Sequence, residues 1–242
     1  MRLELRFKAL DGYIPLDYRP FIMSFFKGAL SKLYNNIFTE MYSKDNLKPK
    51  SFTFCVFLGK SELKKDRFIL PNNQFKVVIS SYDYATIMYM YNSLLPNRNK
   101  NFKIPLNTSV ILDSVYIKDI ESIKSDKIKI KFLSPLLVRS HTNESDKYLD
   151  YTAQDFNEKL NITINNFIDI LDEEDLKGEK IILTPIKPKK TVVKNMNLYF
   201  PASFGEYEIQ GNQKLLNYLL NAGIGSRRGE GFGMFMEVKN EN

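Results

Sequence analysis

The sequence predicts an α+β protein built from two tandem ferredoxin-like domains, each with the β-α-β-β-α-β order of an RRM-like fold. Two observations predict this class. Strand-like and helix-like segments follow that order over residues 1–121, and the same order starts again over residues 122–242. A polar stretch without a strong pattern, residues 121–125, separates the two sets. The halves share no visible sequence identity, so the predicted duplication is one of architecture.

The first domain opens on a strand and a long helix. Leu3, Leu5 and Phe7 alternate with charged residues, which is typical of a half-buried strand and not of a signal peptide. Pro20 then marks a helix start, and apolar residues recur at helical spacing as far as Met41. The other predicted elements of this domain are strands at 51–60 and 75–80, a helix at 82–95 and a strand at 104–117.

The second domain opens on a predicted strand at 126–139. Lys127, Lys129 and Lys131 share one face of it because strand side chains alternate; they are either solvated or line an RNA path. The remaining predicted elements are a helix at 152–171, strands at 181–187 and 191–199 joined by a K-P-K-K turn, a helix at 213–222 and a final strand at 232–239.

Composition is compatible with a nucleic-acid partner, although many proteins without one share it. The chain has 242 residues, a formal net charge of +7 and a pI near 9.2, a balance that suits a protein meeting RNA or DNA. No apolar run approaches the roughly 18 residues of a membrane span. The single cysteine, Cys55, lies in an apolar strand pattern and is expected to be buried and inert, so neither a disulfide nor a cysteine metal site is predicted. We expect a cytoplasmic protein without a metal or cofactor.

A glycine-rich loop, residues 223–233, follows the last predicted helix and reads G-I-G-S-R-R-G-E-G-F-G. Glycine at this density permits positive φ and close approach to the main chain, and the adjacent Arg227 and Arg228 are suited to phosphate oxygens. Dinucleotide and P-loop motifs precede a helix, whereas this loop precedes a strand. We interpret it as a loop that grips a polyanionic backbone; the alternative is a turn with solvated arginines.

Two ferredoxin-like halves with this glycine pattern before the last strand resemble the RAMP superfamily of CRISPR-associated proteins. Three further stretches are similar to its sixth family, the endoribonuclease that processes repeat RNA. They are M-R-L-E-L with the F-F-K-G-A-L helix, K-P-K-S-F-T-F-C-V-F, and F-L-S-P-L-L-V-R. The resemblance extends over nearly the whole chain.

The resemblance implies binding of CRISPR repeat RNA within the precursor transcript and a single metal-independent cut. The 2′-hydroxyl attacks the neighbouring phosphate and leaves a 2′,3′-cyclic phosphate and a 5′-hydroxyl, a reaction that needs a base, an acid and a stabilising cation. Many members place a histidine at the end of the first helix. Here the only histidine is His141, far from that position, and it is expected to be a loop histidine. The family's lysine carries over as Lys50, and Tyr34, Tyr42 or Lys44 would assist proton transfer.

The expected RNA-binding residues lie in the glycine-rich loop, on the first helix and in the K-P-K-K segment. They are Gly223, Gly225, Arg227, Arg228, Gly229, Gly231, Gly233, Lys27, Lys187, Lys189 and Lys190. Two alternatives stay open because the histidine is missing: a repeat-RNA-binding protein with weak or no cleavage, and a RAMP subunit of a guide-RNA complex. Association with a multi-subunit interference complex and a homodimer are also left open.

Overall fold

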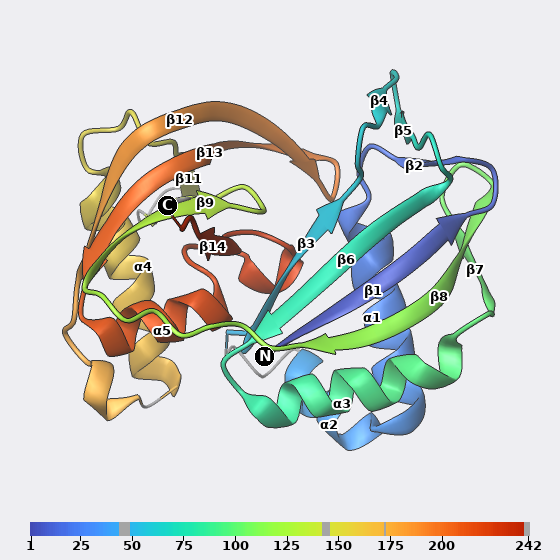
Figure 1. Cartoon of the computed structure of the whole chain (residues 1–242), viewed down its shortest axis with the longest axis horizontal. Coiled ribbons are helices and arrows are strands. Elements are labelled where there is room, and N and C mark those ends of the chain that lie inside the picture. Colours follow the sequence, from blue (N-terminus) through green and yellow to red (C-terminus); the bar gives the residue numbers. More distant parts are fainter. Residues whose placement is uncertain (44–48, 142–145, 172, 240–242) are drawn as a thin grey trace.

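The computed structural model describes residues 1–43, 49–141, 146–171 and 173–239. Figure 1 shows two antiparallel sheets side by side, each with its own pair of long helices. Residues 2–118 form the sheet of the N-terminal half, and residues 127–237 form that of the C-terminal half. Each half has its own hydrophobic core.

The N-terminal sheet has the order β3-β6-β1-β8-β7. Its first four strands, with two helices, follow the chain order β-α-β-β-α-β. The elements are β1 (Arg2–Ala9), α1 (Arg19–Leu33), β3 (Phe52–Phe57), β6 (Gln74–Ser81), α3 (Tyr84–Leu94) and β8 (Thr108–Lys118), with β7 (Asn101–Ile104) at the edge. Asp83 caps α3 by accepting hydrogen bonds from the backbone N–H groups of Ala85 and Thr86. Short strands β2 (Tyr13–Pro15), β4 (Glu62–Leu63) and β5 (Arg67–Ile69) form a separate small sheet.

The C-terminal sheet has the order β12-β13-β9-β14, so it repeats the order of strands 2-3-1-4 in the first half. Its elements are β9 (Lys127–Phe132), α4 (Phe156–Leu171), β12 (Ile181–Asn195), β13 (Leu198–Gly211), α5 (Gln213–Ala222) and β14 (Phe235–Glu237). A separate hairpin, β10 (Val138–His141) with β11 (Asp146–Leu149), lies between β9 and α4 in the chain. The 3-10 turns are η1 (Leu95–Asn97), η2 (Glu174–Leu176) and η3 (Arg228–Glu230). The predicted class, two tandem ferredoxin-like units, is confirmed; a domain division at residues 121–122 stays a prediction.

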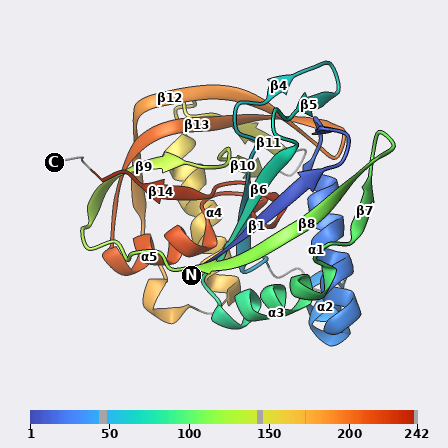
Figure 2. The ribbon, with the colours of Figure 1, turned by 45° about the vertical axis from the view of Figure 1, so that its right-hand side comes forward.

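The K-P-K-K segment is not a turn, which corrects the sequence prediction. β12 continues through it, with a shift in register between Pro185 and Lys187. Pro188 is tolerated because β12 is an edge strand, where a missing N–H need not break the ladder. The turn comes instead at Met196 and Asn197, both at positive φ (52° and 64°). Figures 1 and 2 show the resulting long hairpin arching over toward the N-terminal half, where the Asn197 N–H donates to Asp17 Oδ2 at 3.1 Å.

Four other predicted elements are divided or shortened. The helix expected from Pro20 breaks at Tyr34 (φ −135°, ψ 64°), and α2 (Asn35–Tyr42) follows. The strand predicted at 126–139 ends at Phe132, ahead of the Ser-Pro pair, and resumes as β10. The strand predicted at 104–117 contains the β7–β8 turn, where Leu106 and Asn107 have positive φ. The last strand covers only three of the residues predicted for it.

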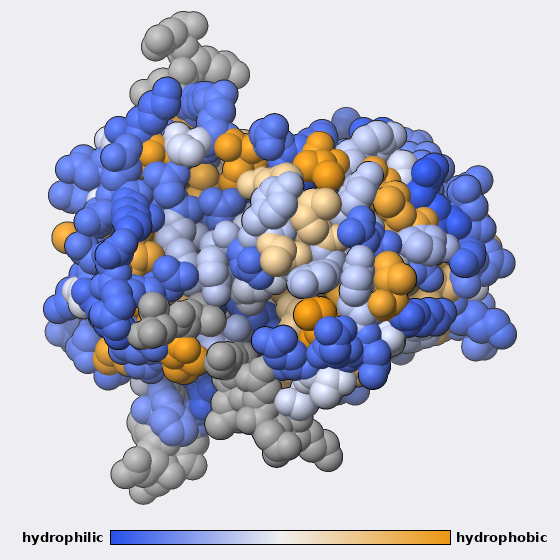
Figure 3. Space-filling view, turned by 90° about the horizontal axis from the view of Figure 1, so that it is seen from below, coloured by the Kyte–Doolittle hydropathy of each residue, from blue (hydrophilic) through white to orange (hydrophobic). Residues whose placement is uncertain are grey.

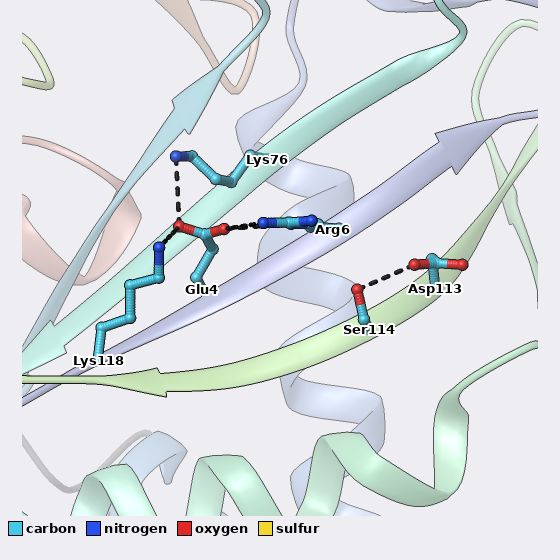
Figure 4. A network of polar contacts seen from close by, with 6 residues as sticks. All are labelled: Glu4, Arg6, Lys76, Asp113, Ser114 and Lys118. Atoms are coloured by element: carbon cyan, nitrogen blue, oxygen red, sulfur yellow. Dashed lines mark hydrogen bonds and ion pairs between the residues drawn. The ribbon is translucent and has the colours of Figure 1, made fainter.

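Glu4 lies on the face of the N-terminal sheet that points away from α1 and α3 (Figure 4). Its side chain is only 5% exposed, yet three cations surround it. Arg6 lies at 3.1 Å, Lys118 at 2.9 Å and Lys76 at 3.3 Å. Burial raises the pKa of Glu4, but the hydrogen bonds from Lys118 and Arg6, together with Lys76, outweigh burial and lower the pKa to about 2.

The face seen from below Figure 1 carries its hydrophobic residues in small patches among hydrophilic ones (Figure 3). Hydrophilic residues crowd the left-hand part of this view, on the side of the C-terminal half. Within the described part of the chain, no helix has the length and apolar character needed to cross a membrane.

Candidate nucleic-acid interface and active site

The glycine-rich loop docks on β3 and the residues just before it, so it joins the two halves. A Cβ on Gly223 would lie 2.9 Å from Thr53 Cγ2, and a Cβ on Gly231 would lie 2.6 Å from the Phe54 ring. Both glycines also have positive φ, 79° and 86°. A Cβ on Gly229 would lie 2.7 Å from Lys50 Cγ. These three positions therefore need glycine because the protein packs against itself there.

The other two glycines of the loop face their own half. A Cβ on Gly225 would lie 2.4 Å from the Leu137 carbonyl oxygen, and a Cβ on Gly233 would lie 1.8 Å from that of Ile224. The sequence indicated that Gly225 and Gly229 leave room for an RNA backbone. In the structure, other protein atoms occupy the space next to both α-carbons. Contact of this loop with RNA stays a prediction.

Buried arginines complete the junction between the halves. Arg2 Nη2 donates to the carbonyl oxygens of Leu220 at 3.2 Å and Phe235 at 2.8 Å. Arg19 Nε donates to the Gly231 carbonyl oxygen at 3.4 Å, and its guanidinium lies 4.4 Å from the centre of the Phe232 ring. Each arginine belongs to the N-terminal half and satisfies backbone carbonyls of the C-terminal half, which fixes how the halves meet.

A cavity of about 840 Å³ opens between the halves, next to this junction. From the predicted site it brings together Lys27, Tyr42, Lys50, Gly225, Arg227, Arg228 and Gly229. Its other lining residues include Arg139, His141 and Tyr148 of the β10–β11 hairpin, Lys159 and Phe167 of α4, and Glu230 of the loop. The lining is rich in cations and includes aromatic rings, which is the combination that single-stranded nucleic acid requires.

Lys50 and Tyr42 meet on the N-terminal side of this cavity. Lys50 Nζ donates to the Met41 carbonyl oxygen and lies 4.9 Å from the centre of the Tyr42 ring. Lys27 Nζ lies 4.7 Å from the same ring. Burial, and then the charge of Lys27, lower the pKa of Lys50. Burial raises the pKa of Tyr42, so its hydroxyl stays protonated at neutral pH. Lys44 lies outside the described residues.

Arg227 and Arg228 point in different directions. Arg227 is at positive φ (55°), and its NH1 donates to both Glu230 carboxylate oxygens at 3.0 Å. Arg227 Nε donates to the Tyr148 hydroxyl at 2.8 Å. Arg228 is 5% exposed, lies 3.7 Å from the centre of the Phe167 ring and donates to the Ala222 carbonyl oxygen at 3.3 Å. Burial lowers the pKa of Arg228 to about 10. Arg227 is therefore the more accessible of the two.

Other predicted residues lie away from the cavity lining described above. The Tyr34 hydroxyl accepts from Asn92 at 3.3 Å, and its ring packs edge-on against Tyr89, so it faces α3. Lys187, Lys189 and Lys190 are exposed along β12, and Lys190 pairs with Asp150 at 2.7 Å. On β9, Lys127 and Lys129 pair with glutamates of β13 at 2.9 and 2.8 Å.

Sequence reasoning missed the β10–β11 hairpin. Arg139 and His141 occupy alternate positions of β10, and Tyr148 and Asp146 lie opposite them on β11. The signal in the sequence was R-S-H followed shortly by D-K-Y, two short alternating runs. Within the described ranges, no group of three or more His, Cys, Asp or Glu side chains is arranged to hold a metal ion.

Fold and cavity together define a class of protein with two ferredoxin-like units, a glycine-rich loop at their junction and a basic cavity beside it. The family profile described as CRISPR-associated protein Cas6, C-terminal, matches residues 117–237. The chain belongs to the Cas6 family of CRISPR-associated proteins, as its sequence indicated.

Solved structures share this fold over almost the whole chain. One, described as a RAMP protein binding different RNA substrates, is 18% identical with a TM-score of 0.83, covering 99% of this chain and 100% of its own. A protein of a Cas6-related gene from Pyrococcus furiosus is 19% identical with a TM-score of 0.85, covering 100% and 99%. A Cas6 product complex is 13% identical with a TM-score of 0.73, covering 98% and 99%. Curated protein sequences give no match.

Proposed function

We propose that this protein binds CRISPR repeat RNA in the cavity between its halves and cuts it once, by attack of a ribose 2′-hydroxyl on the neighbouring phosphate. The observation that carries the proposal is the convergence of Lys50, Tyr42 and Lys27 with Arg227 on one cavity. These residues come from sequence segments far apart, and the junction of the halves places them together. Membership in the Cas6 family supports repeat RNA as the substrate.

The reaction develops negative charge on the phosphoryl oxygens, and the cavity supplies cations to meet it. Lys50 from the N-terminal half and Arg227 from the glycine-rich loop would stabilise the transition state. The Lys50 amine, whose pKa is lowered by burial and by the charge of Lys27, can also orient the 2′-hydroxyl by a hydrogen bond. Tyr42, kept protonated by burial, can donate a hydrogen bond but is a poor base.

The names of two relatives support RNA as the ligand. One relative is described as a RAMP protein binding different RNA substrates, and another as Cas6 in a product complex. On this chain the exposed Lys187 and Lys189 of β12 offer further cations for phosphate contacts. Phosphate contacts of this kind position RNA without reading its bases.

A second candidate function is repeat-RNA binding without cleavage. The segment at the end of the first helical region carries no histidine, and the guanidinium of Arg227 already bonds to Glu230. An engaged arginine must exchange an internal carboxylate for a phosphate before it can stabilise a transition state. A cytoplasmic location, association with an interference complex and a homodimer stay proposals.

A denaturing gel of the purified protein with end-labelled repeat RNA in EDTA distinguishes the two candidates. A parallel reaction uses RNA with 2′-deoxyribose at the candidate cut sites. One product that persists in EDTA and disappears with the deoxy substitution supports the 2′-hydroxyl mechanism. Intact RNA, together with repeat-selective binding on a native gel, would instead support the binding protein.

A further inference from the structure

The β10–β11 hairpin carries a histidine–carboxylate pair at the edge of the cavity. His141 and Asp146 lie directly opposite each other in the hairpin register. His141 Nδ1 lies 2.6 Å from Asp146 Oδ1, and Arg139 donates to the other carboxylate oxygen, Oδ2, at 2.8 Å. Asp146 is thus held from two sides, and the imidazole is held by Asp146.

The Asp146 contact fixes the tautomer of the imidazole. An ionised carboxylate only accepts hydrogen bonds, so His141 Nδ1 carries a proton and donates it. Arg139 NH2 lies 3.3 Å from the same nitrogen, but Nδ1 cannot accept while it donates to Asp146, so the Arg139 bond to Asp146 is the productive one. Nε2 is left as the nitrogen that can exchange a proton with a ligand.

The hairpin is fixed to the rest of the proposed site. Tyr148, opposite Arg139 in the hairpin, accepts from Arg227 Nε at 2.8 Å, and its ring packs on Phe200. The His141 side chain is 71% exposed, so a ligand in the cavity can reach it. The charged and titratable groups that share this cavity are Lys27, Tyr42, Lys50, Arg139, Tyr148, Lys159, Arg227, Arg228 and Glu230.

We propose that His141, oriented by Asp146, donates the proton to the leaving 5′-oxygen of the cut RNA. The inference rests on the proposed nuclease function. The 2′-oxygen bonds to phosphorus as its proton passes to water, the bond from phosphorus to the 5′-oxygen breaks, and His141 Nε2 supplies the proton that makes the 5′-hydroxyl. Asp146 acts as a positioning residue, because it holds Nδ1 of the imidazole and leaves Nε2 free to face the ligand. The chain thereby supplies a histidine from the C-terminal half.

A substrate with sulfur in place of the leaving 5′-oxygen tests this assignment, because a thiolate leaves without a proton. Under single-turnover conditions, His141→Ala should slow cleavage of ordinary repeat RNA about 10²- to 10⁴-fold. The same variant should cut the sulfur-containing RNA within a few-fold of the wild-type rate, and its RNA affinity should be unchanged. Equal slowing on both substrates, or no slowing on either, would overturn the proposal.

Asp146→Asn and Ser140→Ala complete the experiment. Asp146→Asn should slow only the ordinary substrate, whereas Ser140→Ala, on the other face of β10, should match wild type on both. If wild-type protein cuts neither RNA, the nuclease function fails with it; if it cuts and His141→Ala cuts equally, only the present inference fails.

Discussion

At the scale of single residues, Glu4 makes the free energy of unfolding depend on pH in the acid range. Its folded-state pKa is lowered to about 2 from an ordinary value of 4.5. The stabilisation is fully present above pH 4.5 and is lost as pH falls through the folded pKa. We expect Glu4→Gln to lower the free energy of unfolding at pH 7 by about 1–2 kcal/mol, less than the full pKa difference implies because its partners are solvent-screened.

Urea titrations of wild type and Glu4→Gln between pH 7 and pH 2 measure this difference. The two stabilities should converge as pH falls from about 4.5 toward 2, and added salt should reduce the gap at pH 7. A gap that stays constant over the whole pH range would contradict the ion-pair explanation. Glu62→Gln, at an exposed pair with Lys64, is the matched control and should change stability little.

Lys50 is expected to affect cutting more than binding. Its amine lies in the cavity beside the Tyr42 ring. There it would stabilise the negative charge that develops on the phosphoryl oxygens only during the reaction. Lys50→Ala should slow single-turnover cleavage about 10²- to 10³-fold and weaken repeat binding by less than tenfold. The exposed Lys60→Ala serves as the control. Equal losses in rate and affinity would assign Lys50 to binding instead.

The two loop arginines should give different results although they are adjacent. Arg228→Ala removes a buried guanidinium from the Phe167 ring, and we expect it to lower the free energy of unfolding by about 2–4 kcal/mol. Arg227→Ala should cost about 1 kcal/mol or less, but it should weaken RNA binding and reduce the salt slope by about one. Chemical denaturation and a salt titration of binding separate the effects; identical results for both variants would contradict the structure.

At the scale of elements, the glycine-rich loop depends on its contacts with β3. Gly231→Ala places a methyl group against the Phe54 ring at a backbone angle unfavourable to alanine. We expect a loss of about 2–4 kcal/mol in the free energy of unfolding. Gly178→Ala is the matched control: its φ is also positive, at 77°, but its Cβ would meet open space, so the loss should be about 1 kcal/mol. Equal losses in the two variants would mean that backbone strain alone, and not the contact with Phe54, explains the effect of Gly231→Ala.

The long elements could be predicted from the sequence, but their interruptions could not. Burial of one side of a strand or helix produces a periodic pattern of apolar residues in the sequence. This pattern has period two at Leu3, Leu5 and Phe7 and helical spacing in α1 and α5. The path of β12 through Pro188 depends on its place at the sheet edge, which only the assembled sheet defines. The break at Tyr34 likewise has no strong local signal, because neither glycine nor proline, the two strong helix breakers, stands there.

Residues of the candidate site could be predicted where they lie in the glycine-rich loop or just before β3. Lys50 and Arg227 were found in this way, and the structure brings both to the cavity. The different environments of Arg227 and Arg228 could not be predicted, since burial of the Arg228 guanidinium depends on Phe167 of α4 packing against it. The pairing of His141 with Asp146 depends on the β10–β11 hairpin, which the sequence did not predict: the predicted strand ended at residue 139, and His141 was expected in a loop.

At the scale of the whole molecule, the two halves should respond together to damage at their junction. Phe54 belongs to the N-terminal core and also lies under Gly231. Phe54→Ala should lower stability by about 3–5 kcal/mol and speed amide hydrogen exchange in both β3 and β14. Phe75→Ala, in the same core, is the control and should speed exchange mainly in the N-terminal sheet. Exchange that changes only in the N-terminal half for both variants would mean that the halves are energetically independent.

The positions of the loop glycines have a consequence for recognising distant homologues. Gly223, Gly229 and Gly231 are required wherever a chain packs its glycine-rich loop against the preceding half in this manner, whether or not the protein cuts RNA. A homologue that lost its nuclease activity would still need them to remain folded. Their presence in a genome-derived sequence therefore diagnoses the architecture, and evidence of catalysis must be sought among the side chains of the cavity.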